Sequence, residues 1–262
     1  SILLKELGFI SPRTKYLNLK FNGQKNKFIF QEKITKELLE NVNLTEGPIV
    51  EASQRFVWPE SEKEYFDERF TQGRMVNEAW AIKNEETFKF SLIALTKFNQ
   101  TVSQDTTVFN LKDINNGNQL YNETNFAYDT ILTAMNAIHG LGPRDRKFYF
   151  DPLNLVFLPI YYDGNANIIN KITDDNFDKN NTNIFAYKGV DSSLKLLNNL
   201  DINKLLEKLN NSGLIFEEKD LRNTVDRIRN NIIKIKNAKI KNDISSIKKQ
   251  YFSRLDEDAG NK

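Results

Sequence analysis

The sequence contains no cysteine, and this absence excludes several kinds of site at once. Disulfide frameworks, thiolate metal sites and cysteine nucleophiles all need a thiol, so none of them operates in this chain. No apolar run approaches the roughly 18 residues that a membrane-spanning helix requires. The cellular compartment stays open, because a chain without cysteine is compatible with a reducing or an oxidising one.

Histidine is almost as scarce, since His139 is the only one among 262 residues. One histidine cannot build a histidine-rich metal site, and the sequence has no Gly-x-Ser-x-Gly nucleophile elbow. A histidine-dependent hydrolase is therefore the weakest of the functional hypotheses. Histidine is nevertheless the residue type whose ordinary pKa suits proton transfer near neutral pH.

The charges are close to balanced, with 37 Lys and Arg against 35 Asp and Glu. Basic residues gather visibly only between Arg222 and Lys249, where apolar residues also recur at helical spacing, which favours a solvated helix face over a nucleic-acid site. We expect no nucleic-acid partner. Hydrophobic residues make up 39% of the chain, which predicts a packed core rather than disorder.

The first 56 residues predict a small β-rich unit. Polar and apolar residues alternate over Lys15–Phe21, as they do in a half-buried strand. Asn22–Gly23 follows, which is the strongest short hairpin signal, and Lys27–Glu32 is expected to return as the second strand. A third strand is expected at Ile49–Ser53.

The remainder, residues 57–262, predicts a larger and mainly helical unit. Helical spacing of apolar residues starts near Ser61, and a helix over residues 125–138 is expected to end at Gly140. Aromatic runs within residues 147–162 predict a β-hairpin. The last long helix carries an apolar stripe of Leu221, Val225, Ile228, Ile232 and Ile235. The expected fold class is therefore α+β.

Residues 136–165 carry the strongest chemical signal. His139 and Asp145 stand in a loop bent by glycine and proline after a helix, and Asp163 ends a strand just before a glycine. An acid–base group after a helix and a carboxylate at a strand end form a layout that phosphoryl transfer uses. The three residues could converge in space, because a short hairpin joins their two segments.

Each of these residues also has an ordinary structural interpretation. A histidine at a helix C-terminus interacts favourably with the helix dipole. This structural interpretation is the favoured one when His139 is considered by itself. Asp145 could pair with Arg144 or Arg146. Asp163 could be a turn residue, because turns favour Asp-Gly as well.

Several motifs, taken in chain order, resemble the spore-coat protein H (CotH) kinase-like family. They cover about residues 1–169, and none of them is specific by itself. The segments that carry the resemblance are Lys5–Gly23, Phe28–Glu40, Phe126–Asn136, Phe148–Phe150 and Leu158–Asp163.

The resemblance implies a two-lobed, atypical kinase that transfers phosphate from ATP, with Mg²⁺, to a hydroxyl. The acceptor would be a protein serine or threonine, a sugar or a cell-envelope polymer. It implies that Asp163 and Asp145 hold Mg²⁺ and that His139, with Asp145, lies at the catalytic position. Glu32 would position the lysine that binds the nucleotide phosphates.

Two departures from the family pattern leave a second hypothesis open. The family usually has an aspartate at the catalytic-base position, where this chain has Ile138 and His139, and an asparagine where Asp145 stands. The opening residues predict the end of a helix at Gly8, so we expect the family's lysine strand to lie upstream of Ser1. A catalytically inactive pseudokinase that acts as a binding or structural protein is the alternative.

Overall fold

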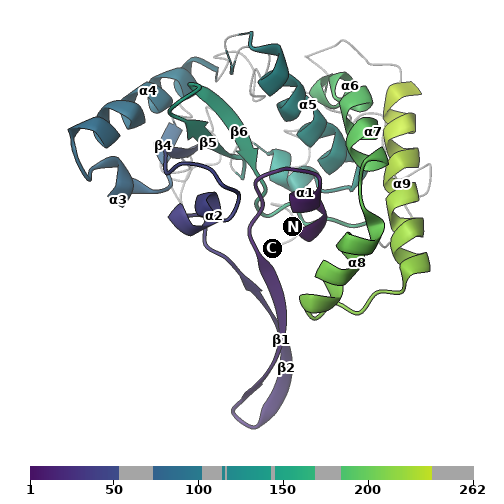
Figure 1. The fold of residues 1–262 in the computed structure, drawn as a ribbon. Coiled ribbons are helices and arrows are strands. Elements are labelled where there is room, and N and C mark those ends of the chain that lie inside the picture. Colours follow the sequence, from purple (N-terminus) through teal and green to yellow (C-terminus); the bar gives the residue numbers. More distant parts are fainter. Residues whose placement is uncertain (53–72, 102–113, 116, 143–144, 169–183, 238–262) are drawn as a thin grey trace, which may run out of the picture.

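The structure is a computed structural model that describes residues 1–52, 73–101, 114–115, 117–142, 145–168 and 184–237. It has a mixed α+β fold, so the predicted fold class is confirmed at this level. A central sheet has helices packed beside it, and a long hairpin projects from the body (Figure 1). The helix predicted to begin near Ser61 lies outside the described residues.

The central sheet has four antiparallel strands in the order β4-β3-β5-β6. Their bounds are Ile49–Ala52 for β3, Gly73–Met75 for β4, Lys147–Asp151 for β5 and Val156–Ile160 for β6. The last two strands form the predicted aromatic hairpin, which is thereby confirmed. Period-two alternation in these strands sends successive side chains to opposite faces of the sheet.

Both faces of the sheet are covered, which explains why β5 and β6 carry runs of apolar residues in their interiors. On one face, Phe148 and Phe157 pack in edge contacts against Phe98 of α4 (Glu85–Thr101). On the other face, Ile49 and Tyr149 pack against the short helix α2 (Lys36–Glu40).

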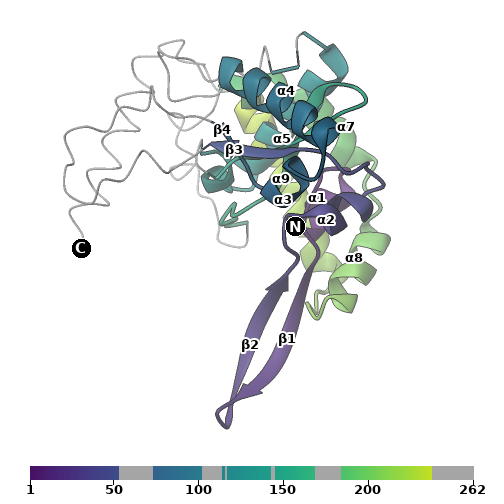
Figure 2. The ribbon, with the colours of Figure 1, turned by 90° about the vertical axis from the view of Figure 1, so that its left-hand side faces the viewer.

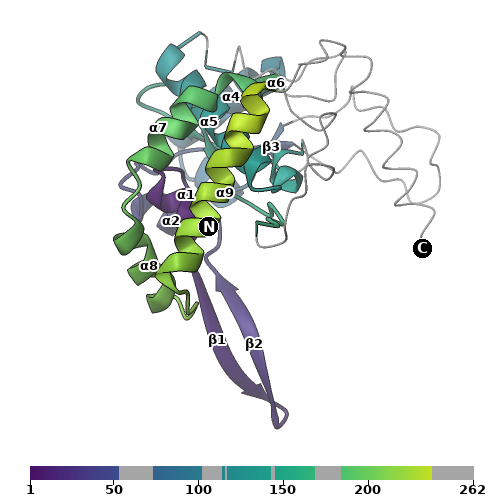
Figure 3. The ribbon, with the colours of Figure 1, turned by 90° about the vertical axis from the view of Figure 1, so that its right-hand side faces the viewer.

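The helical part of the molecule is built around α5 (Gln119–Ala134), whose middle is completely buried. The stripe predicted for the last helix, α9, lies in the same core, so that prediction is confirmed. The other helices are α1 (Ile2–Glu6), α3 (Glu78–Ala81), α6 (Ile184–Lys188), α7 (Val190–Asn198), α8 (Ile202–Asn211) and α9 (Glu218–Asn237). Helices α7 and α9 lie beside each other along α5 (Figure 3).

Helix α5 ends earlier than its sequence predicts. Gly140 does not stop it, because Asn136 already adopts a left-handed conformation with φ of 51°. The amide of Ala137 donates to the carbonyl of Leu132, and that of Asn136 donates to the carbonyl of Thr133. These two bonds form a Schellman motif, in which asparagine substitutes for the usual glycine. His139 consequently lies beyond the helix, on a separate 3-10 turn.

Residues 1–52 contribute to several parts of the molecule. The predicted hairpin is present as β1 (Thr14–Phe21) and β2 (Gln24–Gln31), and it projects away from the body in two perpendicular views (Figures 1 and 2). Strand β3, by contrast, pairs with β5 inside the central sheet. Helix α1 packs against α8, where Glu6 pairs with Lys208. The division into units of residues 1–56 and 57–262 stays a prediction.

Candidate functional site

Two loops, separated in sequence by the β5–β6 hairpin, meet at the candidate site. The first is the 3-10 turn Ile138–Leu141, and the second follows β6 from Tyr161 to Asn165. A Cβ added to Gly140 would lie 2.8 Å from the carbonyl oxygen of Tyr162 and 3.1 Å from Cα of Gly164. A Cβ on Gly164 would lie 2.7 Å from the ring of Tyr161. The two backbones therefore approach closely because both positions are glycine.

This contact brings His139, Asp145 and Asp163 together. Their potential ligand atoms all lie within 4.8 Å of one another. Nδ1 of His139 is 3.3 Å from Oδ2 of Asp145. The His139 side chain is 54% exposed and that of Asp145 is 24% exposed, so the group opens to solvent rather than into the core. The roles assigned to the three residues from the sequence stay predictions.

The backbone after β6 is turned by two residues with positive φ. Asp163 has φ of 38° and Asn165 has φ of 45°. Aspartate and asparagine are the residues other than glycine that most readily adopt this left-handed region, because their short polar side chains bond locally. Both residues are exposed, whereas Gly164 between them is buried. The chain thus presents an Asp and an Asn at its surface on either side of its contact with Gly140.

The first loop is anchored to α5 by a buried ion pair. Arg146 follows Asp145 directly, and its guanidinium donates to both carboxylate oxygens of Asp129, at 3.2 Å for Nη1 to Oδ2. Both side chains are almost fully buried, at 3% and 0% exposure. The guanidinium also stacks on the ring of Phe148, 5.1 Å from its centroid. Arg146 therefore forms an ion pair with Asp129 and holds the end of the loop against the core.

Sequence reasoning missed Asp129, although one signal was present. Asp129 is spaced three residues before Leu132 and so falls on the apolar, buried face predicted for that helix. A carboxylate on such a face needs a buried partner of opposite charge. The nearest arginines in the sequence are Arg144, which lies outside the described residues, and Arg146.

The second loop is anchored by the N-terminal segment. The amide of Tyr161 donates to the carbonyl of Ile10 at 2.8 Å, and Ile10 forms a parallel bridge with Ile160. Burial raises the pKa of Tyr161, the amide of Gly164 opposes that shift, and the nearby Asp163 carboxylate adds to it. Tyr161, two residues before the predicted metal ligand Asp163, is thus held by the N-terminal segment on one side and by Gly164 on the other.

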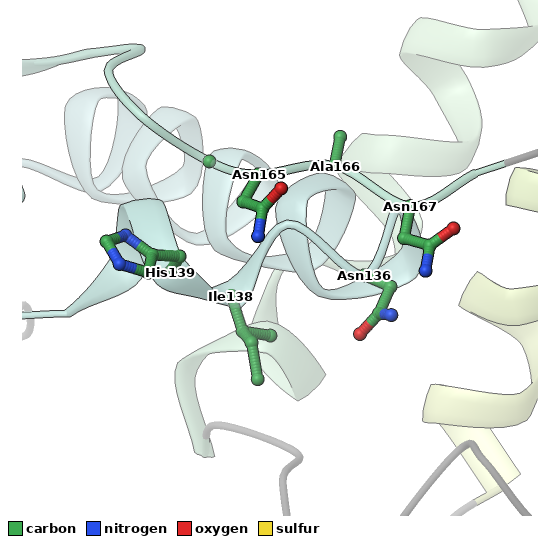
Figure 4. A pocket seen from close by; sticks show the side chains of 7 residues that line it. Asn136, Ile138, His139, Asn165, Ala166 and Asn167 are labelled. Atoms are coloured by element: carbon green, nitrogen blue, oxygen red, sulfur yellow. The ribbon is translucent and has the colours of Figure 1, made fainter. Parts of the chain in front are cut away.

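A hollow of about 470 Å³ opens beside His139, which is the one of the three residues that lines it. Figure 4 shows its lining on two facing segments, with Asn136, Ile138 and His139 on one and Asn165, Ala166 and Asn167 on the other. Asparagine amides supply both donors and acceptors, so the hollow can bind a polar molecule with hydroxyl or phosphate oxygens.

Glu32, predicted to help bind the nucleotide, lies at the base of the β1–β2 hairpin. Its carboxylate accepts bonds from the backbone amide and the guanidinium of Arg13, at 3.0 and 2.7 Å, and from the side chain of Asn41 at 2.6 Å. It is not part of the group formed by His139, Asp145 and Asp163. In this arrangement Glu32 stabilises the base of the hairpin.

A row of charges, also missed from the sequence, crosses the sheet toward the site, with Glu51 and Lys147 largely buried and Arg74 exposed. Glu51 pairs with Lys147 on one neighbouring strand and with Arg74 on the other. The ammonium group of Lys147 lies 4.3 Å from the ring centroid of Tyr162, the residue before Asp163. Burial lowers the pKa of Lys147 to about 8. The row therefore places a partly desolvated lysine at the edge of the site.

The three candidate ligands have the chemistry of a divalent-cation site. Two carboxylates suit Mg²⁺ and Ca²⁺, which prefer oxygen. Ligands of one Mg²⁺ lie at most about 4.2 Å apart, and those of one Ca²⁺ about 5 Å apart. The 4.8 Å limit in this site thus suits Ca²⁺ as it stands, and Mg²⁺ after the side chains close by about half an ångström.

Comparisons with known proteins add no family to this picture. Neither a protein-family model nor a curated protein matches this chain. No helix in the ranges that the structure covers is both long and apolar enough to cross a membrane.

Proposed function

We propose that this chain is an atypical kinase, resembling the CotH family, that transfers phosphate from ATP to a hydroxyl. The observation that carries the proposal is the convergence of His139, Asp145 and Asp163, from two separate loops, on one exposed site. A catalytic base and two carboxylates beside a polar hollow are what phosphoryl transfer requires.

The contact between His139 and Asp145 supports the role of base. Nδ1 of His139 lies 3.3 Å from Oδ2 of Asp145. A hydrogen bond from Nδ1–H to this carboxylate would leave Nε2 as the proton acceptor. Nε2 then takes the proton of the acceptor hydroxyl, whose oxygen bonds to phosphorus as the bond to the nucleoside diphosphate breaks.

The two carboxylates divide the remaining work. Asp163 and the second oxygen of Asp145 would hold the cation, which would neutralise charge on the phosphate oxygens. The amides of Asn165 and Asn167 line the adjoining hollow and would orient the oxygens of the bound molecule. Because Asn165 and Asn167 lie on the segment after Asp163, binding in the hollow would be coupled to the position of the Asp163 carboxylate.

One observation favours the alternative of a binding protein without turnover. Both oxygens of Glu32 already accept bonds from Arg13 or Asn41, so the carboxylate does not need a nucleotide-binding lysine as a partner. A chain that binds nucleotide without a positioned lysine would show affinity but little transfer.

The experiment titrates ATP and Mg²⁺ into the chain by calorimetry and measures release of ADP in parallel. The proposal expects cation-dependent binding and ADP release, both of which Asp163→Asn removes. Binding that depends on Asp163 without ADP release supports the inactive alternative. Binding that is unchanged in Asp163→Asn rejects both.

A further inference from the structure

The β1–β2 hairpin carries an apolar face that nothing in the described part of the chain covers. Cross-strand pairing places Leu17 opposite Phe28 and Lys15 opposite Phe30, so one face collects every second residue. The four most exposed apolar residues of this face are Leu19 at 47%, Phe21 at 69%, Phe28 at 42% and Phe30 at 62%. We call these four residues the apolar face of the hairpin.

The opposite face is basic. It carries Lys20, Lys25 and Lys27, with Lys20 directly opposite Lys25. Residues 14–31 contain no acidic side chain, and Lys15 is the only lysine in register with the apolar face. The hairpin is therefore an amphipathic ribbon with an excess of positive charge in a chain whose net charge is only +2.

The ribbon is held firmly at its base. The amide of Tyr16 donates to the carbonyl of Ser212 at 2.8 Å, and the hydroxyl of Thr14 bonds to that of Ser1. Glu32 and Arg13 pair where the two strands enter the body. A two-stranded hairpin is marginal by itself, so these contacts are what present it outward (Figure 2).

We propose that the hairpin docks the protein on an anionic lipid membrane, with its apolar face in the interface. An amphipathic element with lysines on one face and Phe and Leu on the other is suited to lie in the plane of the headgroups. Each lysine near an anionic leaflet adds to the attraction. The open strand edges require hydration, so the ribbon lies in the interface and does not span the bilayer.

Charge and area both favour lipid over a second copy of the chain. The apolar face offers about 300–500 Å² per copy, so stacking two of them would bury less than the roughly 1,000 Å² of a specific interface. A second copy also brings the same lysines, whereas an anionic membrane complements them. Three of the hairpin's four lysines lie on the face opposite Phe21, Phe28 and Phe30, whereas a single-stranded nucleic-acid site combines a basic groove with stacked aromatic rings.

The test is co-sedimentation of the full chain with vesicles of phosphatidylserine and phosphatidylcholine in equal parts, and with vesicles of phosphatidylcholine alone. We expect binding to the mixed vesicles that weakens as salt is raised. Phe30→Ser should weaken it about tenfold, because the ring no longer enters the interface. The matched control is Ile29→Ser, since Ile29 is the chain neighbour, is 61% exposed and lies on the basic face.

Two further variants test the apolar face and the basic face of the hairpin separately. Phe21→Ser near the tip should act like Phe30→Ser, and the combined change of Lys20, Lys25 and Lys27 to Gln should remove the preference for phosphatidylserine. Circular dichroism checks that each variant is folded. Equal losses in Ile29→Ser and Phe30→Ser, or no vesicle binding at all, overturn the proposal.

Sedimentation velocity distinguishes the other occupant. If Phe30→Ser converts a dimer to a monomer while vesicles bind neither form, the apolar face is an interface between copies and the lipid proposal is wrong. None of these outcomes depends on phosphate transfer, because the vesicles contain no nucleotide and the variants lie far from His139 in sequence.

Discussion

Asp145 and Arg146 are neighbours in sequence but enter opposite environments. Arg146 is buried and paired with Asp129, whereas Asp145 is partly exposed and lies beside the half-exposed His139. The pair of Arg146 and Asp129 fixes the end of the loop on α5. The pair of Asp145 and His139 lies at the surface of the loop. The buried ion pair of Arg146 therefore holds the solvent-facing Asp145 in place through a single peptide bond.

The largest effect should follow the loss of Asp163. Asp163→Asn removes a carboxylate that the cation needs, so divalent binding and ADP release should be abolished. Asparagine tolerates the positive φ at this position, so unfolding free energy should change by less than about 0.5 kcal/mol. Calorimetry and urea unfolding check both. A strongly destabilised variant would mean that the carboxylate is structural.

The next effect separates the base from the metal ligands. His139→Ala should lower the rate of ADP release by about two to four orders of magnitude, the usual contribution of a general base. Nucleotide affinity should hardly change, because a base acts mainly in the transition state. Steady-state rates with and without acceptor measure this, and a variant with full turnover would exclude His139 as the base.

Breaking the buried ion pair of Asp129 and Arg146 should lower the unfolding free energy of the protein. Asp129→Ala leaves Arg146 without its partner in the core, so the unfolding free energy should fall by about 3–5 kcal/mol. Asp145→Ala should cost less, about 1 kcal/mol, because its partner His139 is 54% exposed to solvent. Denaturant unfolding of both variants makes the comparison directly. Equal losses of unfolding free energy in the two variants would contradict the assignment of Asp129 to a structural ion pair and of Asp145 to a surface pair.

The smallest effect concerns the contact between the two loops. Gly140→Ala would place a Cβ 2.8 Å from the Tyr162 carbonyl, which should cost about 1–3 kcal/mol and weaken cation binding. Gly142→Ala is the milder variant, since its Cβ would lie 3.2 Å from the carbonyl oxygen of His139 and 3.6 Å from Oδ2 of Asp145. If both variants bind the cation equally well, the close approach of the loops is not needed for the site.

Local signals in the sequence predicted the local structure well. Asn22–Gly23 was sufficient to identify the β1–β2 hairpin, and the stripe from Leu221 to Ile235 identified the buried side of α9. The apolar stripe repeats over many residues, so a single exception does not change the prediction, and Asn-Gly favours a tight hairpin turn by its backbone preference. The end of α5 depended on one residue, and there asparagine acted where glycine was expected.

Long-range partners could not be read from the same patterns. Asp129 and Arg146 are 17 residues apart, and β3 pairs with β5 almost a hundred residues later. Such contacts depend on how elements pack, which one sequence does not reveal. The convergence of His139, Asp145 and Asp163 could be suggested only because a short hairpin joins their two segments.

The most direct test of the central claim uses the single histidine. Because the chain has only His139, its imidazole signals in a proton–nitrogen NMR spectrum report on the site without further assignment. We predict that Mn²⁺, added as a paramagnetic substitute for Mg²⁺, broadens these signals at low concentration, that excess Mg²⁺ restores them, and that Asp163→Asn abolishes the effect. Signals that stay sharp in the presence of Mn²⁺, or that broaden equally in Asp163→Asn, would contradict a cation site formed by Asp145 and Asp163 beside His139.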